Sequence, residues 1–235
     1  SGFPEKGIRV AVVGDIHVRD SSNGYEDLSD LLDLILGSKT ELILLLGDYT
    51  ATPSSVSDMY THRSEVAERL SVLTGVPVAA VLGNYETWSG PAEWKQSLSI
   101  AGITVLHNEV ATINIKGKDF CIRGLGDAYT NQFKHVDFPD ECTHLPKITI
   151  THDPAGAFNA GIEGIIFAAH THCGQISLPF LGALWIPTEA PREATCGLYQ
   201  DAKRLLWVTS GVGTSILPIR FGAQSQWDLL TLLEK

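Results

Sequence analysis

Five short polar motifs follow one another along this chain, and each carries side chains that can bind a metal ion. The motifs are GDIH at residues 14–17, GDY at 47–49, GNYE at 83–86, HD at 152–153 and AHTH at 169–172. Together they supply two carboxylates, one amide and four imidazoles, namely Asp15, His17, Asp48, Asn84, His152, His170 and His172. Gly-Asp and Gly-Asn pairs also form ordinary turns, but the ordered succession of all five motifs predicts a centre for two divalent ions.

The types and spacing of these donors indicate which ions they suit. Asp15 and His17 are two residues apart, so in an extended chain both side chains point to the same side and can bind one ion. A carboxylate such as Asp48 can bridge two ions that lie roughly 3.5–4 Å apart. Oxygen and imidazole donors without thiolates suit manganese, iron or zinc. We therefore expect two divalent metal ions as cofactors, with manganese ranked first.

Three of the motifs follow apolar runs that predict buried strands. Residues 8–13, 42–46 and 76–82 are rich in Val, Ile and Leu, and each run ends directly at a motif. Between them, residues 25–36 carry apolar side chains at helical spacing, and a second helix is predicted over about 60–73. Strands that alternate with helices predict a parallel sheet, whose ligand sites lie beyond the carboxyl ends of its strands.

The second half of the chain carries fewer signals for helices. A helix is predicted near residues 92–101, and short strands are predicted at 110–115, 119–123, 147–151 and 164–168. The last two strands end at His152 and His170. We predict an α/β protein in which a more antiparallel half joins the parallel half, and in which both halves contribute ligands at a shared edge.

Size and charge limit the classes of protein to consider. The chain has 235 residues, of which 44% are hydrophobic and 19% charged, so it can form one large α/β domain with a sizeable core. We predict a single domain, 1–235, with its core at about 8–232, and regard residues 1–7 as an appended or truncated N-terminus. The formal net charge of −10 argues against a nucleic-acid partner.

Cysteine spacing and hydropathy say little about where the protein works. The four cysteines lie far apart without CxxC spacing, so we expect reduced thiols at Cys121, Cys142, Cys173 and Cys196. No apolar run reaches the roughly 18 residues that span a bilayer, so the chain as given is expected to be soluble. Because the sequence begins with Ser1 and not with Met, a native signal or anchor stays open, as do the compartment and the oligomeric state.

The order of the motifs resembles that of the calcineurin-like metallophosphoesterase family. The family shows D-x-H, G-D, G-N-H-[DE], a later H and G-H-x-H, which match the five motifs above. The chain is more similar still to the bacterial YkuE/YaeI-like phosphodiesterase branch, which is related to UDP-2,3-diacylglucosamine hydrolases. Two further segments carry this resemblance: HTHCGQ at 170–175, which an apolar loop follows at 176–187, and GVGTSILPIRF at 211–221.

The resemblance implies a fold, a ligand set and an activity. The fold is a four-layer α/β sandwich of two mixed β-sheets flanked by helices. One ion would be held by Asp15, His17, Asp48 and His172, and the other by Asp48, Asn84, His152 and His170, so that Asp48 bridges the two. Ala169 stands where the family usually has glycine. The activity is hydrolysis of phosphoric esters by a metal-activated water, without a protein nucleophile.

The chain departs from the family pattern at Tyr85, where the motif has a histidine thought to contact the phosphate and assist the leaving group. Histidine titrates near neutrality and can donate a proton, whereas a tyrosine hydroxyl mainly donates a neutral hydrogen bond. Three explanations stay open: the natural leaving groups need no proton, a deliberate substitution slows turnover, or catalysis has been lost. Glu86 keeps the acidic residue of the motif and is expected to hold a ligand in place.

Candidates for substrate contact lie outside the metal motifs. Residues 176–187 contain Phe180, Leu181, Leu184, Trp185 and Ile186. They form either a buried connection or an apolar rim that receives an acyl chain or touches a membrane surface, with Leu181 and Trp185 as the candidate contacts. Arg220 is a further candidate, because a guanidinium can pair with phosphate, and the same holds for Arg123 and Arg192. The histidines His62, His107, His135 and His144 lack partners at ligand spacing.

The predicted function is binuclear metal-dependent hydrolysis of phosphoric esters, above all of phosphodiester or pyrophosphate bonds in a small molecule that can carry a lipid. Two alternatives stay open. One is a weakly active or inactive protein that binds phosphoryl ligands through its metals, and the other is a general phosphomonoesterase. Turnover of an aryl phosphodiester with added manganese separates an enzyme from a binding protein, and comparison with a monoester separates the two enzymes.

Overall fold

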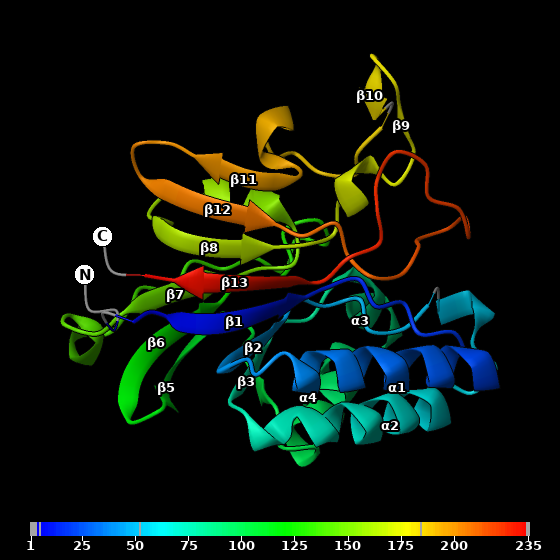
Figure 1. Ribbon diagram of the computed structural model, residues 1–235, viewed down its shortest axis with the longest axis horizontal. Coiled ribbons are helices and arrows are strands. Elements are labelled where there is room, and N and C mark those ends of the chain that lie inside the picture. The colour runs from blue at the N-terminus through cyan, green and yellow to red at the C-terminus, as the bar shows by residue number, and fades with distance from the viewer. Residues whose placement is uncertain (1–3, 5, 52, 184, 234–235) are drawn as a thin grey trace.

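In the computed structural model, the strands of the first β-sheet come mostly from the amino-terminal half of the chain (Figure 1). The structure describes residues 4, 6–51, 53–183 and 185–233; Leu184 and most of the predicted N-terminal appendage lie outside them. The strand order is β13-β1-β2-β3-β4, in which β1 to β4 are parallel and β13 is antiparallel to β1. The bounds are Ile8–Val13 for β1, Leu42–Leu45 for β2, Val78–Ala80 for β3, Thr104–Val105 for β4 and Asp228–Leu232 for β13.

Helices cover the outer face of this sheet (Figure 1). They are α1 (Ser22–Gly37), α2 (Met59–Leu70) and α4 (Pro91–Ile100), while the short α3 (Asn84–Ser89) follows β3 at the site. The first three confirm the helices predicted from the sequence. Side chains cap the start of α1, where Ser21 accepts the N–H of Gly24, and of α2, where Asp58 accepts the N–H groups of Tyr60 and Thr61. None of the helices that the structure describes is long and apolar enough to cross a membrane.

The second β-sheet has the order β11-β12-β8-β7-β6-β5. Its strands are β5 (Glu109–Ile115), β6 (Lys118–Gly124), β7 (Lys147–Ile150), β8 (Gly164–Ala168), β11 (Gly197–Gln200) and β12 (Arg204–Val208). The prediction of a more antiparallel half is confirmed at the edges of this sheet, where β5 and β11 pair antiparallel with their neighbours, whereas the central strands β6, β7, β8 and β12 are parallel. Long irregular segments form the crossovers between the parallel strands of this sheet. The scarcity of helices therefore did not require every strand to pair antiparallel.

The two sheets pack face to face around a shared apolar core. Alternate residues of β1 divide between the two faces of their sheet, since Val10 and Val12 meet the second sheet whereas Ala11 and Val13 meet the helices. The outer face of the second sheet is covered by loops and by short 3-10 helices, at Pro154–Phe158 and Arg192–Ala194. The layers are therefore helices, sheet, sheet and a thin cover, which confirms an α/β sandwich of two mixed sheets.

All four cysteines are paired, which corrects the expectation of reduced thiols. Cys121 bonds to Cys142, and Cys173 bonds to Cys196. The partners are 21 and 23 residues apart, and they meet only through the folded sheet, so the absence of a short CxxC motif did not exclude pairing. The second disulfide joins the turn that follows His172 to the residue before β11.

Candidate metal centre

The seven predicted ligands come together where the carboxyl ends of the two sheets meet. From the first sheet, Asp15 and His17 follow β1, Asp48 follows β2, and Asn84 opens α3 after β3. From the second sheet, His152 follows β7, and His170 and His172 follow β8. All seven side chains are buried. Both sheets therefore contribute donors to one place, and the binding of metal there stays a prediction.

Two groups of donors can each hold an ion. Donor atoms of Asp15, His17 and His172 lie within 4.8 Å of one another, and so do those of Asp48, His152 and His170. Asp48 joins the groups, because its Oδ2 lies 3.7 Å from Nε2 of His17 and 3.5 Å from Nε2 of His152. This is the position that a bridging carboxylate requires.

Backbone carbonyls orient three of the histidine rings. Nδ1 of His17 lies 3.2 Å from the carbonyl oxygen of Thr50, and Nδ1 of His152 lies 2.6 Å from that of Leu46. Nε2 of His170 lies 2.6 Å from the carbonyl oxygen of Pro187. Because a carbonyl can only accept, these nitrogens donate, and the opposite nitrogen of each ring faces the other ligands. Metal-binding histidines are commonly oriented in this way.

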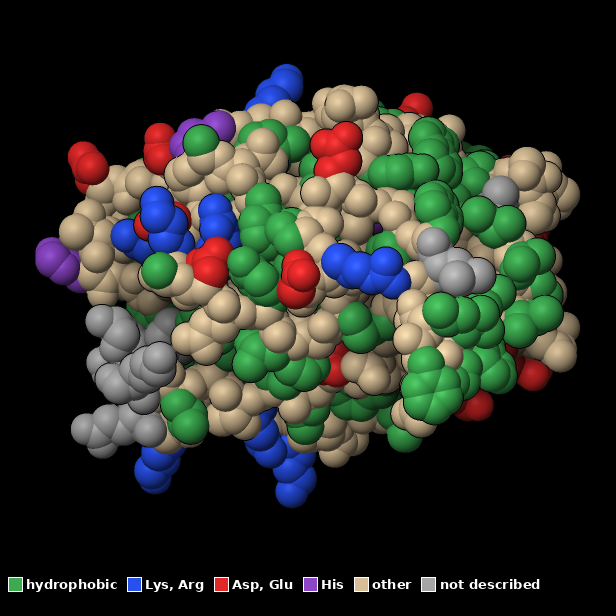
Figure 2. Space-filling model, turned by 90° about the horizontal axis from the view of Figure 1, so that it is seen from above, with side chains coloured by type: hydrophobic (Ala, Val, Ile, Leu, Met, Phe, Trp, Pro, Cys, Tyr) green, Lys and Arg blue, Asp and Glu red, His purple; other side chains and the backbone are tan. Residues whose placement is uncertain are grey.

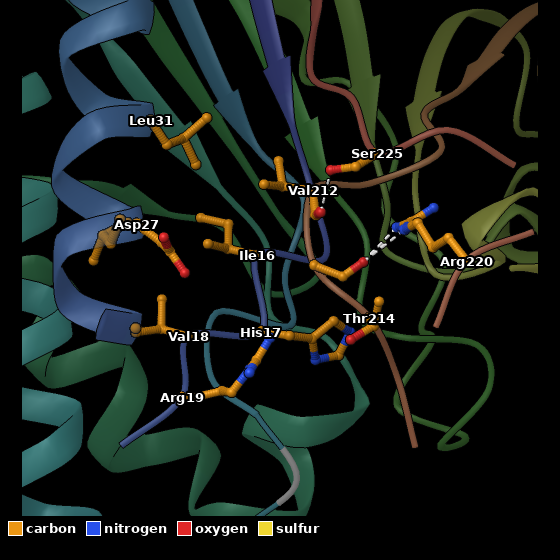
Figure 3. Close-up of a pocket in the computed structure, with 13 residues that line it drawn as sticks. Ile16, His17, Val18, Arg19, Asp27, Leu31, Val212, Thr214, Arg220 and Ser225 are labelled. Atoms are coloured by element: carbon orange, nitrogen blue, oxygen red, sulfur yellow. Dashed lines mark hydrogen bonds between the residues drawn. The ribbon is translucent and has the colours of Figure 1, made fainter. Parts of the chain in front are cut away.

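His172 is oriented differently, by Arg220. Nη2 of Arg220 lies 2.9 Å from Nδ1 of His172, and since a guanidinium has no acceptor, the histidine accepts. Nε of Arg220 donates to the carbonyl oxygen of Gly213 and Nη1 to Oγ of Ser210, while Nη2 also contacts the carbonyl oxygens of Ser210 and Gly211. Arg220 and His17 both line a cavity of about 390 Å³ between α1 and residues 212–225 (Figure 3). The structure thus places this predicted phosphate contact where it positions His172.

Burial and close charges shift the pKa values of the ligands. Burial raises the pKa of Asp15 from 3.8 to about 7, against the lowering effect of His152. Burial also lowers the pKa of His17 to about 4, so this imidazole is neutral at pH 7. Burial also opposes the charged forms of Asp48 and His152, but the attraction between these two groups dominates. The pKa of Asp48 is therefore held below its usual range, and the pKa of His152 is raised well above 6.5. In the metal-free protein, a proton on His152 balances the negative charge of Asp48.

Five of the seven ligands have left-handed backbone conformations. The φ angles are +51° for Asp15 and His17, +54° for Asp48, +69° for His170 and +49° for His172. Asp and His adopt this region more readily than most residues, yet each instance still costs on the order of 1–3 kcal/mol. Such strain gathers at functional sites, where the surrounding structure holds it in place.

Two glycines allow the loops around the ligands to approach closely. A Cβ atom on Gly83 would lie 2.3 Å from Oδ1 of Asp48. A Cβ atom on Gly14 would lie 2.5 Å from the Cβ of Ala169. The alanine at the usual glycine position of the last motif therefore fits because its neighbour in space is glycine.

Glu86 holds the loops that carry Asp48 and Asn84. Its side chain is fully buried, and its oxygens accept the N–H groups of Asp48, Tyr49 and Gly83 at 2.8–2.9 Å. Burial and the nearby Asp48 raise the pKa of Glu86 to about 7, while the N–H donors oppose this rise. The acidic residue of the third motif thus acts on the ligands through the backbone, as expected from the sequence.

Tyr85 lies over the first donor group. Its backbone N–H donates to Oδ1 of Asp48 at 2.9 Å, and its ring meets His17 edge-on with 4.8 Å between centroids. The hydroxyl lies 2.9 Å from Oγ of Ser215. The residue that replaces the family histidine is therefore inside the centre and pairs with a hydroxyl from a distant loop.

A cavity of about 500 Å³ opens above the two donor groups. Asp48, Asn84, His170 and His172 line it together with Tyr85. Its walls are largely apolar and include Trp88, Tyr129, Trp185, Ile216 and Leu217. Sequence reasoning missed Trp88 and Tyr129. The sequence held a signal for Trp88, which stands three residues after Tyr85 and so shares a face of α3 with it. It held no signal for Tyr129, which lies on a loop that brings its ring centroid to 4.6 Å from that of His170.

The remaining candidates divide between the cavity and the surface. Trp185 lines the cavity, whereas Leu181 is 68% exposed beside it. Neither is part of a buried connection. Arg123 is buried and donates to Thr149, and Arg192 donates to the carbonyl oxygen of Ala183, so neither guanidinium faces the donor groups.

Comparisons with known proteins agree with this geometry. The model of the calcineurin-like phosphoesterase family matches residues 8–174. The chain is 30% identical over 212 residues to "Phosphodiesterase YaeI" of Escherichia coli K12, which covers 88% of this chain and 75% of that protein. It is 28% identical over 235 residues to "Uncharacterized metallophosphoesterase YkuE" of Bacillus subtilis 168, which covers 96% of this chain and 79% of that protein.

A solved structure shows the same fold at low sequence identity. The crystal structure of a 5'-nucleotidase precursor from Thermus thermophilus matches with a TM-score of 0.55 and 16% identity. The match covers 96% of this chain and 54% of the nucleotidase. At this identity, the likeness concerns the architecture and the placement of the strands alone.

Proposed function

The chain belongs to the calcineurin-like phosphoesterase family and is a phosphoester hydrolase, and from this premise we propose that it cleaves phosphodiester or pyrophosphate bonds with two divalent ions, manganese foremost. The observation that carries the proposal is the pair of buried donor groups beneath one cavity, joined by Asp48. One ion would be held by Asp15, His17, Asp48 and His172, and the other by Asp48, Asn84, His152 and His170. Such ions polarise phosphoryl oxygens and lower the pKa of water so that it attacks phosphorus.

Tyr85 is suited to hold a phosphoryl oxygen and not to protonate a leaving group. Its hydroxyl and that of Ser215 are hydrogen-bonded to each other at the edge of the cavity, so one of the pair keeps an O–H that can donate to a substrate oxygen. No imidazole occupies position 85 to supply a proton at neutral pH. We therefore infer natural leaving groups that depart as stable anions, such as an activated phenol or a nucleoside phosphate.

The cavity walls favour a substrate with an apolar group next to its phosphate. Trp88, Tyr129 and Trp185 offer ring surfaces within reach of the donor groups. Burying apolar area on such walls stabilises a complex by about 25 cal/mol per Å². An amphiphilic or lipid-bearing phosphoester fits this pattern better than a small polar one.

Hydrolysis and metal content test the proposal together. Protein reconstituted with manganese is expected to hold close to two ions by elemental analysis and to cleave an aryl phosphodiester faster than the corresponding monoester. Asp48→Asn should lose both ions and the activity, because the bridge serves both sites. Asp119→Asn, a substitution at an exposed position of β6, is the matched control and should retain both.

Other outcomes would favour the alternatives. A stoichiometry of one or less that Asp48→Asn leaves unchanged contradicts a binuclear centre. Two bound ions without turnover of any ester favour a protein that only binds phosphoryl ligands. The tyrosine at position 85, where the family has histidine, is the feature that supports this alternative. A faster monoester reaction favours a general phosphomonoesterase.

A further inference from the structure

Exposed apolar side chains gather on two segments that line the cavity. Three of them, Phe180, Leu181 and Trp185, lie on residues 176–187, and three more, Ile216, Leu217 and Ile219, lie on residues 214–221. Phe180 is fully exposed, and the other five are 51–77% exposed. We call these six side chains the apolar rim. Hydrophobic side chains gather on the corresponding end of the molecule in Figure 2, and contiguous exposed apolar patches mark interaction sites.

Hydrogen bonds hold the two segments of the rim side by side. Nε2 of Gln175 donates to the carbonyl oxygens of Ser215 and Leu217, and its Oε1 accepts the N–H of Ser215. The N–H of Ser177 donates to the carbonyl oxygen of Phe221 at 2.7 Å. In Figure 1 the β9 and β10 hairpin (Ser177–Leu178 and Gly182–Ala183) projects from the body beside the segment that precedes β13. The rim is thus one projecting surface.

The rim segments carry almost no charge in a strongly acidic protein. Residues 176–188 contain no Asp, Glu, Lys or Arg, and residues 210–227 contain only Arg220, which is turned towards His172. The chain as a whole has a formal net charge of −10. The two rim segments themselves therefore carry no acidic side chain, and the guanidinium of Arg192, which donates to the carbonyl oxygen of Ala183, is a single cation beside the hairpin.

We propose that the apolar rim seats the protein on the surface of a zwitterionic phospholipid bilayer, with the mouth of the cavity turned to the headgroups. Apolar side chains on projecting loops can bury themselves at the boundary between headgroups and acyl chains. A tryptophan such as Trp185 suits the headgroup level, where its amphipathic ring is favoured. Without a cluster of Lys and Arg, the rim gains little from anionic lipids, and the acidic body is repelled by them.

A second copy of the chain is the other occupant to consider. Trp185, Ile216 and Leu217 belong both to the rim and to the cavity wall. A copy that covered the rim would therefore also cover the cavity above the donor groups. A bilayer instead presents phosphate groups at the same mouth. The proposal goes beyond the proposed function, because vesicle binding does not depend on hydrolysis.

Sedimentation of the full chain with phosphatidylcholine vesicles tests the proposal. The wild-type protein should bind, binding should persist at high salt, and added phosphatidylserine should weaken it. Phe180→Ser combined with Ile219→Ser should weaken binding at least about tenfold, since each change removes exposed apolar area. The matched control is Leu34→Ser combined with Leu198→Ser, which changes exposed side chains outside the rim and should bind as the wild type does.

The outcomes separate this proposal from the proposed function. Absence of wild-type binding, or equal binding by the rim variant and the control, overturns the bilayer proposal. A dimer in solution that the rim variant loses, without vesicle binding, overturns it in favour of a second copy. Phe180 and Ile219 do not line the cavity, so the rim variant should keep its thermal stability and its hydrolysis of a water-soluble aryl diester. Vesicle binding by a protein that hydrolyses no ester contradicts the proposed function alone.

Discussion

Residue 85 contacts Asp48 and lines the cavity above the two donor groups. The backbone N–H of Tyr85 holds Asp48, while its hydroxyl pairs with Ser215 at the cavity edge. A histidine at this position would keep the backbone contact and add a group that titrates near neutrality. A tyrosine at position 85 can therefore position the phosphate, whereas a histidine there could also protonate the leaving group.

Tyr85→His is expected to raise the hydrolysis of substrates with poor leaving groups more than that of substrates with good ones. A positioned general acid contributes typically 10²–10⁴-fold, and only where the departing oxygen needs a proton. The measurement is kcat/KM across aryl phosphodiesters of graded phenol acidity. Tyr85→Phe is the control, because it removes the hydroxyl without adding an acid, and it should slow all members alike. A change by Tyr85→His that is equal across the series would mean that residue 85 transfers no proton.

Residue identities near strand ends could be predicted from the sequence, whereas loop residues could not. Asp15, Asp48 and His152 directly follow apolar runs, so their meeting at one edge follows from the parallel sheet. Ser215 and Tyr129 belong to segments without a regular pattern, and only the folded loops bring them to Tyr85 and His170. The role of Arg220 was also hidden, because its partner His172 is 48 residues away.

At the scale of elements, the turn after β8 is joined to the residues before β11 by a disulfide and by a hydrogen bond from Thr171 to the carbonyl oxygen of Thr195. His172 and Cys173 both have left-handed φ angles, +49° and +51°, and Cys173 is bonded to Cys196 ahead of β11. The disulfide thus ties the strained turn to the sheet that carries it. Sequence reasoning could not foresee this bond, since spacing of the cysteines along the chain does not reveal which strands are neighbours.

Removing the Cys173–Cys196 disulfide is expected to weaken metal binding. Cys173→Ala with Cys196→Ala should cost about 3 kcal/mol of unfolding free energy, as the loop length of each disulfide suggests, and should reduce the affinity for one of the two ions by releasing His172. Cys121→Ala with Cys142→Ala is the matched control, because its loop is nearly as long but lies away from the ligands. Titration with manganese measures the metal affinity of both double variants, and denaturant unfolding measures their stability. Equal metal affinity in the two double variants would contradict this role.

At the scale of the whole molecule, bound ions would join the two sheets, because each donor group combines residues from both. We propose that residues 8–232 act as a single domain around the core that the sheets share. Chelation is therefore expected to lower the melting temperature of the entire protein in one transition. At a free ion concentration of about 1,000 times Kd, the loss corresponds to about 4 kcal/mol for each ion. Differential scanning calorimetry checks this, and two separate transitions would contradict a single domain.

The pH dependence of that stabilisation follows from the shifted pKa values. In the metal-free protein the pKa of Asp15 is raised from 3.8 to about 7 by burial, so the folded state holds a proton there that the unfolded state releases. This contribution to stability is fully present below the unfolded pKa and is lost as the pH rises to about 7. The raised pKa of His152 acts in the same direction. His17, with a pKa of about 4, is already neutral near pH 7 and binds no proton that an ion must displace.

Metal ions should therefore stabilise the protein more at pH 8 than at pH 6. Ligation needs an ionised Asp15 and a neutral His152, so at pH 6 an ion must displace protons that the metal-free fold retains, and at pH 8 it displaces fewer. The measurement is the difference in melting temperature between manganese-loaded and chelated protein at the two pH values, with proton release followed by calorimetry in two buffers. Asp119→Asn should behave as the wild type does. A difference in melting temperature that is the same at both pH values, without proton release at pH 6, would mean that the ions do not bind through Asp15 and His152.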